Sequence, residues 1–164
     1  MNAFSFVGWS GSGKTTLISR LIHEFESNGK TVVAVKNAKH KYYLEPESSD
    51  TFKFLESGAR EVCLIAKNEW LIMKPKTETT DMMPILQAQY ATVDLLLLEG
   101  LTSPDIPIIE VFDADKHDGL KFPVEQLHAI ICNKPFVASI PVFHRNDIDA
   151  IIGFIKNDIT NKNN

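Results

Sequence analysis

No uninterrupted apolar stretch in this sequence comes close to the roughly 20 residues that a membrane-spanning helix needs. The N-terminus also lacks the basic and then hydrophobic pattern of a secretory signal. These two absences argue against an integral membrane protein and against a secreted one. We therefore expect a soluble, cytoplasmic protein that has no membrane partner.

An excess of positive charge is missing as well. The chain carries 17 lysines and arginines against 21 aspartates and glutamates, which gives a formal net charge of −4. Proteins that bind nucleic acid generally present a basic face to the phosphate backbone, so we expect no nucleic-acid partner. Any phosphate-binding site in this chain must therefore be local.

Cysteine is scarce, with only Cys63 and Cys132 in the chain. Both lie among apolar residues, in the stretches EVCLI and AIICN. We expect both to be buried strand thiols rather than redox groups or metal ligands.

Apolar strands and amphipathic helices alternate along the 164 residues. Strands are predicted over 2–7, 31–37, 93–100, 106–113 and 127–133, and helices over 14–29, 50–59, 79–91 and from Asn146 or Asp147 onward. Two further strands, 60–67 and 69–74, are predicted to form a hairpin across Lys67 and Asn68. The pattern predicts a three-layer α/β fold with a mainly parallel sheet, as in P-loop NTPases, extended by an antiparallel hairpin. We expect one domain over residues 1–158 and a frayed tail over 159–164.

The stretch GWSGSGKTT, residues 8–16, separates the first strand from the first helix and fits the pattern G-x-x-x-x-G-K-[ST]. Glycines let the backbone turn so that its N–H groups surround phosphate oxygens, and the helix N-terminus adds positive charge. Lys14 is expected to contact the β- and γ-phosphates, and the Thr15 hydroxyl to bind Mg²⁺. The stretch therefore predicts a nucleoside triphosphate site made of Gly8, Trp9, Ser10, Gly11, Ser12, Gly13, Lys14, Thr15 and Thr16.

A carboxylate on the metal side of this site is expected at Glu99. Four consecutive leucines place Glu99 at the carboxyl end of a buried strand, the edge at which ligands bind in open α/β sheets. Glu99 is therefore a candidate catalytic residue, together with Lys14, and a candidate ligand of Mg²⁺ or of its water shell. The alternative is that Glu99 only caps a loop.

The base-binding end of the site is less defined. Many GTPases select guanine with an N-K-x-D loop after a late strand, and Asn133 and Lys134 stand at such a place, but Phe136 replaces the aspartate. A turn that contains Asn-Lys by chance is the alternative interpretation. The residues themselves leave guanine and adenine both open.

Several segments together resemble the family of the molybdopterin-guanine dinucleotide biosynthesis protein B (MobB). They are WSGSGKTTL, VAVKNAKH, the Ser57-Gly58-Ala59 turn that follows Asp50, and DLLLLEGL with the later IPIIEV, so the likeness covers most of the chain up to the final helix. The resemblance implies a GTP-binding adaptor with weak Mg²⁺-dependent GTPase activity. It also implies a homodimer that assists the molybdenum cofactor nucleotidyltransferase in joining GMP to molybdopterin.

The resemblance carries over to single residues. Lys14 and Thr15 match the phosphate and magnesium residues of the family, and Glu99 matches its acidic strand end. Lys36 and His40 match the ends of a K-H-x-x-H segment and are candidate phosphate or pterin contacts, although Lys36 could equally be a solvated strand end.

Two departures from the family pattern lie in the same region. The histidine that follows the lysine is Asn37 here, and residues 45–50 lack the glycine and lysine of the D-x-P-G-K-D loop, although Asp50, a candidate metal ligand, matches its final aspartate. Contacts that this loop makes to the pterin or to the partner enzyme are therefore open.

The reaction is constrained by the small number of arginines. Phosphoryl-transfer enzymes often stabilise the transferred group with arginine, and this chain has only Arg20, Arg60 and Arg145. Slow hydrolysis by an accessory protein is the physically consistent expectation. The alternative is a P-loop kinase that phosphorylates a small metabolite.

Two neighbouring features are interpreted without assigning a new site. Trp9 could stack on a ligand, but such a residue more often packs against a neighbouring loop. The stretch DADKHDG, residues 113–119, lacks the spacing of a calcium loop and is expected to be a solvated turn.

Overall fold

The computed structural model describes residues 2–38, 46, 48–77 and 80–162. The chain forms two compact units, one made of Met1–Asn37 and Met83–Asn164 and the other of Ala38–Met82. Each unit is described on its own below. The single domain expected over residues 1–158 stays a prediction beside this division.

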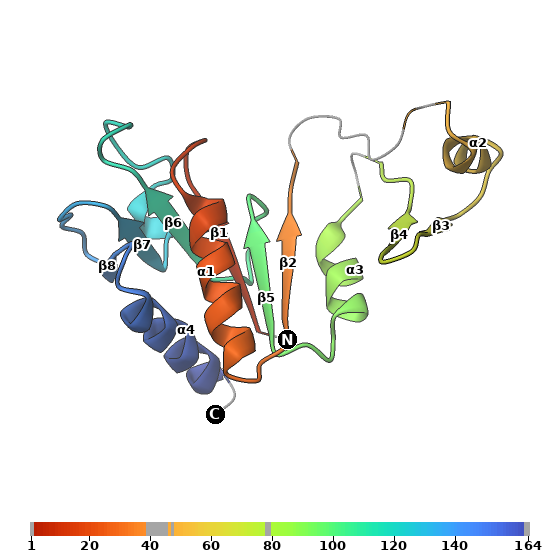
Figure 1. Cartoon of the computed structure of the whole chain (residues 1–164). Helices are drawn as coiled ribbons and strands as arrows, with labels where there is room; N and C mark the ends of the chain where they lie inside the picture. The colour runs from red at the N-terminus through yellow and green to blue at the C-terminus, as the bar shows by residue number, and fades with distance from the viewer. Residues whose placement is uncertain (1, 39–45, 47, 78–79, 163–164) are drawn as a thin grey trace. The chain divides into compact units, whose positions relative to one another are not determined.

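The first unit is built on a six-stranded sheet in the order β2-β5-β1-β6-β7-β8 (Figure 1). Its strands are β1 (Ala3–Val7), β2 (Val32–Lys36), β5 (Leu95–Glu99), β6 (Ile108–Phe112), β7 (Ala129–Cys132) and β8 (Val142–His144). All neighbouring strands pair in parallel. The mainly parallel α/β fold predicted from the sequence is thus confirmed. The ends of the five strands predicted for this sheet differ from the observed ones by at most two residues, and β8 is a strand that the sequence does not predict.

One face of this sheet packs against α1 (Lys14–Ser27) and α4 (Ile148–Lys162). Their apolar stripes share a buried cluster with alternate strand residues such as Phe4, Leu95 and Leu97. The α4 helix extends beyond the expected end of the domain at residue 158, because Ile159 packs against the same cluster.

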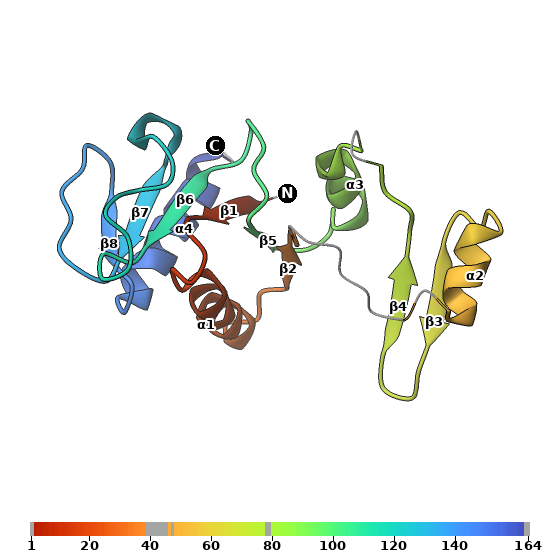
Figure 2. The same cartoon turned by 90° about the horizontal axis from the view of Figure 1, so that it is seen from above.

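The opposite face is covered in two ways. Figure 2 shows α1 and α3 (Met82–Gln89) on opposite sides of β2, and α3 contributes the buried residues Met83 and Leu86. Over β6 and β7 the cover comes from connecting segments that carry Leu120, Phe122 and Phe136 rather than from a long helix. The segment before β7 holds a short 3-10 helix, η1 (Val124–Gln126). Within the described ranges, no helix is long and apolar enough to cross a membrane.

The second unit contains α2 (Asp50–Glu56) and an antiparallel hairpin of β3 (Val62–Ile65) and β4 (Trp70–Met73). Ile65 pairs with Trp70, so the predicted hairpin across Lys67 and Asn68 is confirmed. The pattern of residues 50–59 favours Asp50 as the N-cap of this helix, but the N-cap lies one position earlier. Ser49 is the N-cap, and its hydroxyl accepts the Phe52 N–H at 3.3 Å.

The expectation of two buried thiols is half wrong. Cys132 is buried in β7, whereas Cys63 is exposed in β3. Side chains alternate between the two faces of a strand, and Cys63 shares its face with Ile72, Ile65 and Trp70, all of which are exposed. The apolar neighbours of Cys63 in the sequence therefore do not bury it.

Candidate functional site

The glycine-rich loop, defined here as residues Gly8–Gly13, connects β1 to α1 at the carboxyl edge of the sheet. Gly8 has a φ of +131°, and a Cβ at this position would collide with the backbone oxygen of Val111 in β6. Gly13 is the N-cap of α1 with a φ of +96°, no side chain caps the helix, and its first turn contains no acidic residue. The positive end of the helix dipole is therefore available to an anion next to the loop.

The side chain of Lys14 lies over this loop. Its ammonium donates to the backbone oxygens of Gly8 at 3.2 Å and Trp9 at 2.6 Å, and to Ser12 Oγ at 3.4 Å. The ammonium thus stands beside the same backbone that would surround a phosphate group.

Thr15, Glu99 and Lys36 meet at the ends of neighbouring elements. Thr15 Oγ1 lies 3.1 and 3.0 Å from the two carboxylate oxygens of Glu99, and Lys36 Nζ lies 3.3 Å from Glu99 Oε1. The register explains the meeting, because Glu99 is the direct partner of Phe6 in β1 and of Lys36 in β2. A hollow of about 380 Å³ opens here, lined by Ser10, Gly11, Gly13, Lys14, Thr15, Thr16, Lys36 and Glu99.

The donor set at this point fits Mg²⁺ in part. Thr15 and Glu99 offer a hydroxyl and a carboxylate, the hard oxygen ligands that Mg²⁺ takes alongside waters and substrate phosphates. Asp50 belongs to the second unit, where it pairs with Lys53 at 2.9 Å, and His40 lies outside the described residues. Across the described part of the chain, no group of three or more His, Cys, Asp or Glu side chains could hold a metal ion. Any Mg²⁺ here would thus depend on waters or phosphate oxygens for most of its ligands.

Asn133 and Lys134 lie apart from this hollow, at the carboxyl end of β7. The Asn133 amide accepts the N–H of Ala114 at 2.8 Å and donates to Asp113 at 2.9 Å and to Asp115 at 2.6 Å. Lys134 forms an ion pair with Asp115, which raises the pKa of the Lys134 ammonium above its ordinary value. The structure thus joins the predicted Asn-Lys pair to carboxylates that follow β6.

The expectation that residues 113–119 form a solvated turn is wrong at its first residue. Asp113 is only 4% exposed and pairs with Lys116 at 3.0 Å and with Arg145 at 3.5 Å. The hydrogen bond from Lys116, followed by the Asp115 N–H and the charge of Arg145, lowers the pKa of the Asp113 carboxyl. Arg145 also donates to the backbone oxygen of Phe112 at 3.3 Å. Sequence reasoning missed this pair, and its one local signal is an aspartate directly after an apolar strand.

The 113–119 segment packs on the glycine-rich loop. Lys116 donates to the backbone oxygen of Gly11 at 3.1 Å, and the Trp9 indole donates to that of Gly119 at 3.0 Å. The Trp9 ring also stacks on His117 with centroids 5.6 Å apart. Trp9 therefore packs against a neighbouring loop, the second of the two interpretations of this residue.

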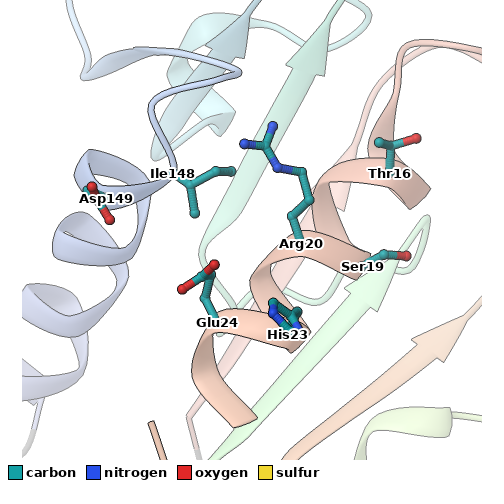
Figure 3. Close-up of a pocket in the computed structure, with 7 residues that line it drawn as sticks. All are labelled: Thr16, Ser19, Arg20, His23, Glu24, Ile148 and Asp149. Carbon is teal, nitrogen blue, oxygen red and sulfur yellow. The ribbon is translucent and has the colours of Figure 1, made fainter. Parts of the chain in front are cut away.

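A second cavity, of about 590 Å³, lies between α1 and α4 (Figure 3). Figure 3 shows Arg20 projecting from α1 into this space, with Thr16 at the end of the helix nearest the glycine-rich loop. Thr16 lines both cavities, and Arg20 donates to Asn146 Oδ1 at 3.4 Å. The residues that line this second cavity are Thr16, Ser19, Arg20, His23, Glu24, Ile148 and Asp149.

Several known proteins similar to this chain are MobB or molybdopterin-guanine dinucleotide biosynthesis proteins. The family model MobB, described as molybdopterin guanine dinucleotide synthesis protein B, matches residues 3–133. A Haemophilus influenzae protein named molybdopterin-guanine dinucleotide biosynthesis adapter protein is 31% identical over 152 residues, which cover 92% of this chain and 85% of that protein. An Escherichia coli protein of the same name is 24% identical and covers 92% and 89%.

Solved structures agree with the fold. The crystal structure of a molybdopterin-guanine biosynthesis protein B superposes with a TM-score of 0.67 at 25% identity, covering 94% of this chain and 98% of that one. A MobB homologue from Bacillus stearothermophilus superposes with a TM-score of 0.67 at 22% identity, covering 98% and 99%. The three-dimensional likeness thus extends over nearly the whole of each chain.

Proposed function

The chain belongs to the MobB family, and from this premise we propose that it is a GTP-binding adapter of molybdopterin guanine dinucleotide biosynthesis. The observation that carries the proposal is the meeting of Thr15 and Glu99 beside the glycine-rich loop, with Lys14 over that loop. Relatives of this chain are named adapter proteins of that biosynthesis.

Different groups of the chain would bind different parts of the nucleotide and its Mg²⁺. Backbone N–H groups of the glycine-rich loop and of the first turn of α1 would hold the phosphates, and Lys14 would contact the β- and γ-phosphates. Thr15 and Glu99 would hold Mg²⁺ directly or through its waters. When bound, Mg²⁺ neutralises charge on the phosphate oxygens. Lys36 Nζ forms an ion pair with Glu99 Oε1 at 3.3 Å, and Lys36 remains the candidate phosphate or pterin contact.

Weak GTPase activity is supported by the contacts of Arg145 and Arg20, whose guanidinium groups already have partners in this unit. Arg145 is held by Asp113 and by the backbone of Phe112, and Arg20 is hydrogen-bonded to Asn146. Neither lines the hollow at the glycine-rich loop. Arg145 Nη1 lies 3.6 Å from the place that a Cβ on Gly13 would take, but Asp113 and the Phe112 backbone hold this side chain. Because both guanidinium groups are already engaged, we expect them to stabilise the transferred group little and GTP hydrolysis to be slow.

The proposed partners are molybdopterin, the molybdenum cofactor nucleotidyltransferase and a second copy of this chain. One face of the hairpin supports the homodimer, because Ile65 and Trp70 are 79% and 68% exposed and Cys63 and Ile72 lie beside them. Contiguous apolar surface of this kind usually marks a protein interface. A role that depends on GTP and on a biosynthetic partner also favours the cytoplasm.

Calorimetric titration with GTP and with ATP, each with Mg²⁺, tests the proposal. We expect the wild type to bind GTP selectively and Lys14→Ala to lose most of that binding. Lys156→Ala, which removes an exposed lysine from α4, is the matched control and should bind as the wild type does.

The same protein distinguishes the adapter from the alternative kinase. An adapter should turn GTP over slowly on its own and change its rate when the nucleotidyltransferase is added. Turnover of about 1–100 s⁻¹ that requires a small phosphate acceptor would favour the P-loop kinase instead. A preference for ATP would contradict the assignment of GTP.

A further inference from the structure

The Asn133-Lys134 turn stands where a nucleotide base would be recognised but lacks an acid of its own. It follows β7 directly, at the same carboxyl edge of the sheet as the glycine-rich loop that follows β1. Phe136 occupies the position at which an N-K-x-D turn has its aspartate, and its ring packs edge-on against Phe112 with centroids 5.6 Å apart. The turn therefore has no carboxylate to contact a base.

A carboxylate reaches this turn from another loop. Phe112 and Cys132 are direct partners in the pairing of β6 with β7, so the two following loops leave the sheet side by side. Asp115 in the first loop accepts a hydrogen bond from Asn133 at 2.6 Å through one oxygen and pairs with Lys134 through the other. The structure thus assembles Asn, Lys and Asp from two loops rather than from one.

Asp115 keeps room for a ligand, in contrast to its neighbour Asp113. The side chain of Asp115 is 55% exposed, whereas that of Asp113 is 5% exposed and is held by Lys116 and Arg145. A carboxylate offers about four lone-pair positions, and one contact on each Asp115 oxygen leaves about two of them free. Those two suit a ligand edge with two adjacent N–H donors.

The loop that carries Asp115 is anchored on both sides. The buried carboxylate of Glu110 accepts the N–H groups of Lys121 at 2.6 Å and Phe122 at 3.0 Å. Lys116 joins the loop to the backbone of Gly11 in the glycine-rich loop at 3.1 Å. Asp115 is therefore held at a defined place next to the phosphate-binding candidate.

We propose that Asp115 recognises the guanine base of GTP, accepting hydrogen bonds from the N1–H and the 2-amino group, in the role of the aspartate that the Asn133-Lys134 turn lacks. This inference rests on the proposed binding of GTP. Adenine has neither of those donors on the corresponding edge, so a carboxylate at this place favours guanine. Asn133 and Lys134 position the carboxylate and do not need to touch the base.

Four nucleotides test this role. Wild type, Asp115→Asn and the control Asp105→Asn, an exposed aspartate before β6, are titrated with GTP, ITP, XTP and ATP in the presence of Mg²⁺. ITP lacks the 2-amino group of GTP, and XTP carries an oxygen in its place. A good bidentate contact discriminates by about 1–3 kcal/mol, so we expect the wild type to bind ITP and XTP about 10- to 100-fold more weakly than GTP.

The Asp115→Asn variant should exchange this preference. An amide donates from nitrogen and accepts through oxygen, which matches the O2 and N1–H of xanthine, so we expect weaker GTP binding and stronger XTP binding. The gain for XTP also shows that the variant is folded, and Asp105→Asn should behave as the wild type. Equal binding of GTP by wild type and Asp115→Asn would overturn the role of Asp115 and leave triphosphate binding intact. Failure of all four nucleotides to bind the wild type would overturn both proposals.

Discussion

Replacing Gly8 with alanine should destabilise the protein through two separate effects. The φ of +131° is a conformation that side chains rarely adopt, and such strain costs about 1–3 kcal/mol. The new Cβ would also collide with the backbone oxygen of Val111, which belongs to a buried strand and has little freedom to move. Overpacking of this kind costs about 1–3 kcal/mol. We expect Gly8→Ala to lower the free energy of unfolding by about 2–6 kcal/mol.

Two other glycines separate these effects. Gly11 has a φ of +73° and nothing within 4 Å of an added Cβ, so Gly11→Ala should lose about 1–2 kcal/mol from the backbone alone. Gly119→Ala meets neither obstacle and should leave stability nearly unchanged. The free energies of unfolding would be compared by urea titration. If Gly8→Ala lost no more stability than Gly11→Ala, the close approach of Gly8 to Val111 would not be a constraint and the reasoning would be refuted.

Three other residues give predictions that one assay each can check. Hydrogen bonds from the Thr31 N–H and from Lys30 lower the pKa of Asp94 to about 2, so its contribution to stability is present above its ordinary pKa and is lost as pH falls through the folded value. Asp94→Asn should therefore be less stable than the wild type at pH 7 in urea titrations, and the difference should shrink as pH is lowered toward that value. Trp70→Glu should convert the proposed dimer to a monomer of unchanged secondary structure, as seen by light scattering and circular dichroism; an undisturbed dimer would exclude the hairpin face as its interface. Glu99→Gln should bind Mg²⁺ at least about tenfold more weakly when titrated with GTP present, and an unchanged Mg²⁺ dependence would remove Glu99 from the metal site.

The central part of the fold could be predicted because its sequence allows few alternatives. Four leucines followed by Glu99 are too apolar for a surface strand, and the structure buries all four in β5. Lys36 and Glu99 each end a strand, and the parallel pairing of β2 with β5 makes them direct partners. The carboxyl ends of parallel strands lie at one edge of the sheet. The predicted order of strands and helices therefore places Lys36 and Glu99 near the glycine-rich loop.

The hairpin shows where such reasoning stops. Strand residues alternate between two faces, and in residues 62–65 both sets are apolar. Only tertiary contacts decide which set is covered, and they bury Val62 and leave Ile65 79% exposed. Cys63 lies on the same exposed face of the hairpin as Ile65. No local pattern in the sequence distinguishes this face from the covered one.

The arrangement around Asp113 could not be predicted because it depends on β8, a strand for which the sequence shows no recognisable pattern. Asp113, Asn133 and Arg145 are each the first residue after the carboxyl end of a strand, namely β6, β7 and β8, which are neighbours in the sheet. Parallel pairing therefore brings an acid, an amide and a base together from positions up to 32 residues apart, since 145 − 113 = 32. With only three residues, β8 is too short to show a period, so the sequence could not place Arg145 beside Asp113. Without Arg145 as a known partner, an aspartate in a run of polar residues indicates a solvated turn. The position of Asp115 could not be predicted for the same reason, because the Asp115 N–H donates to the carboxylate of Asp113, which holds this loop in place.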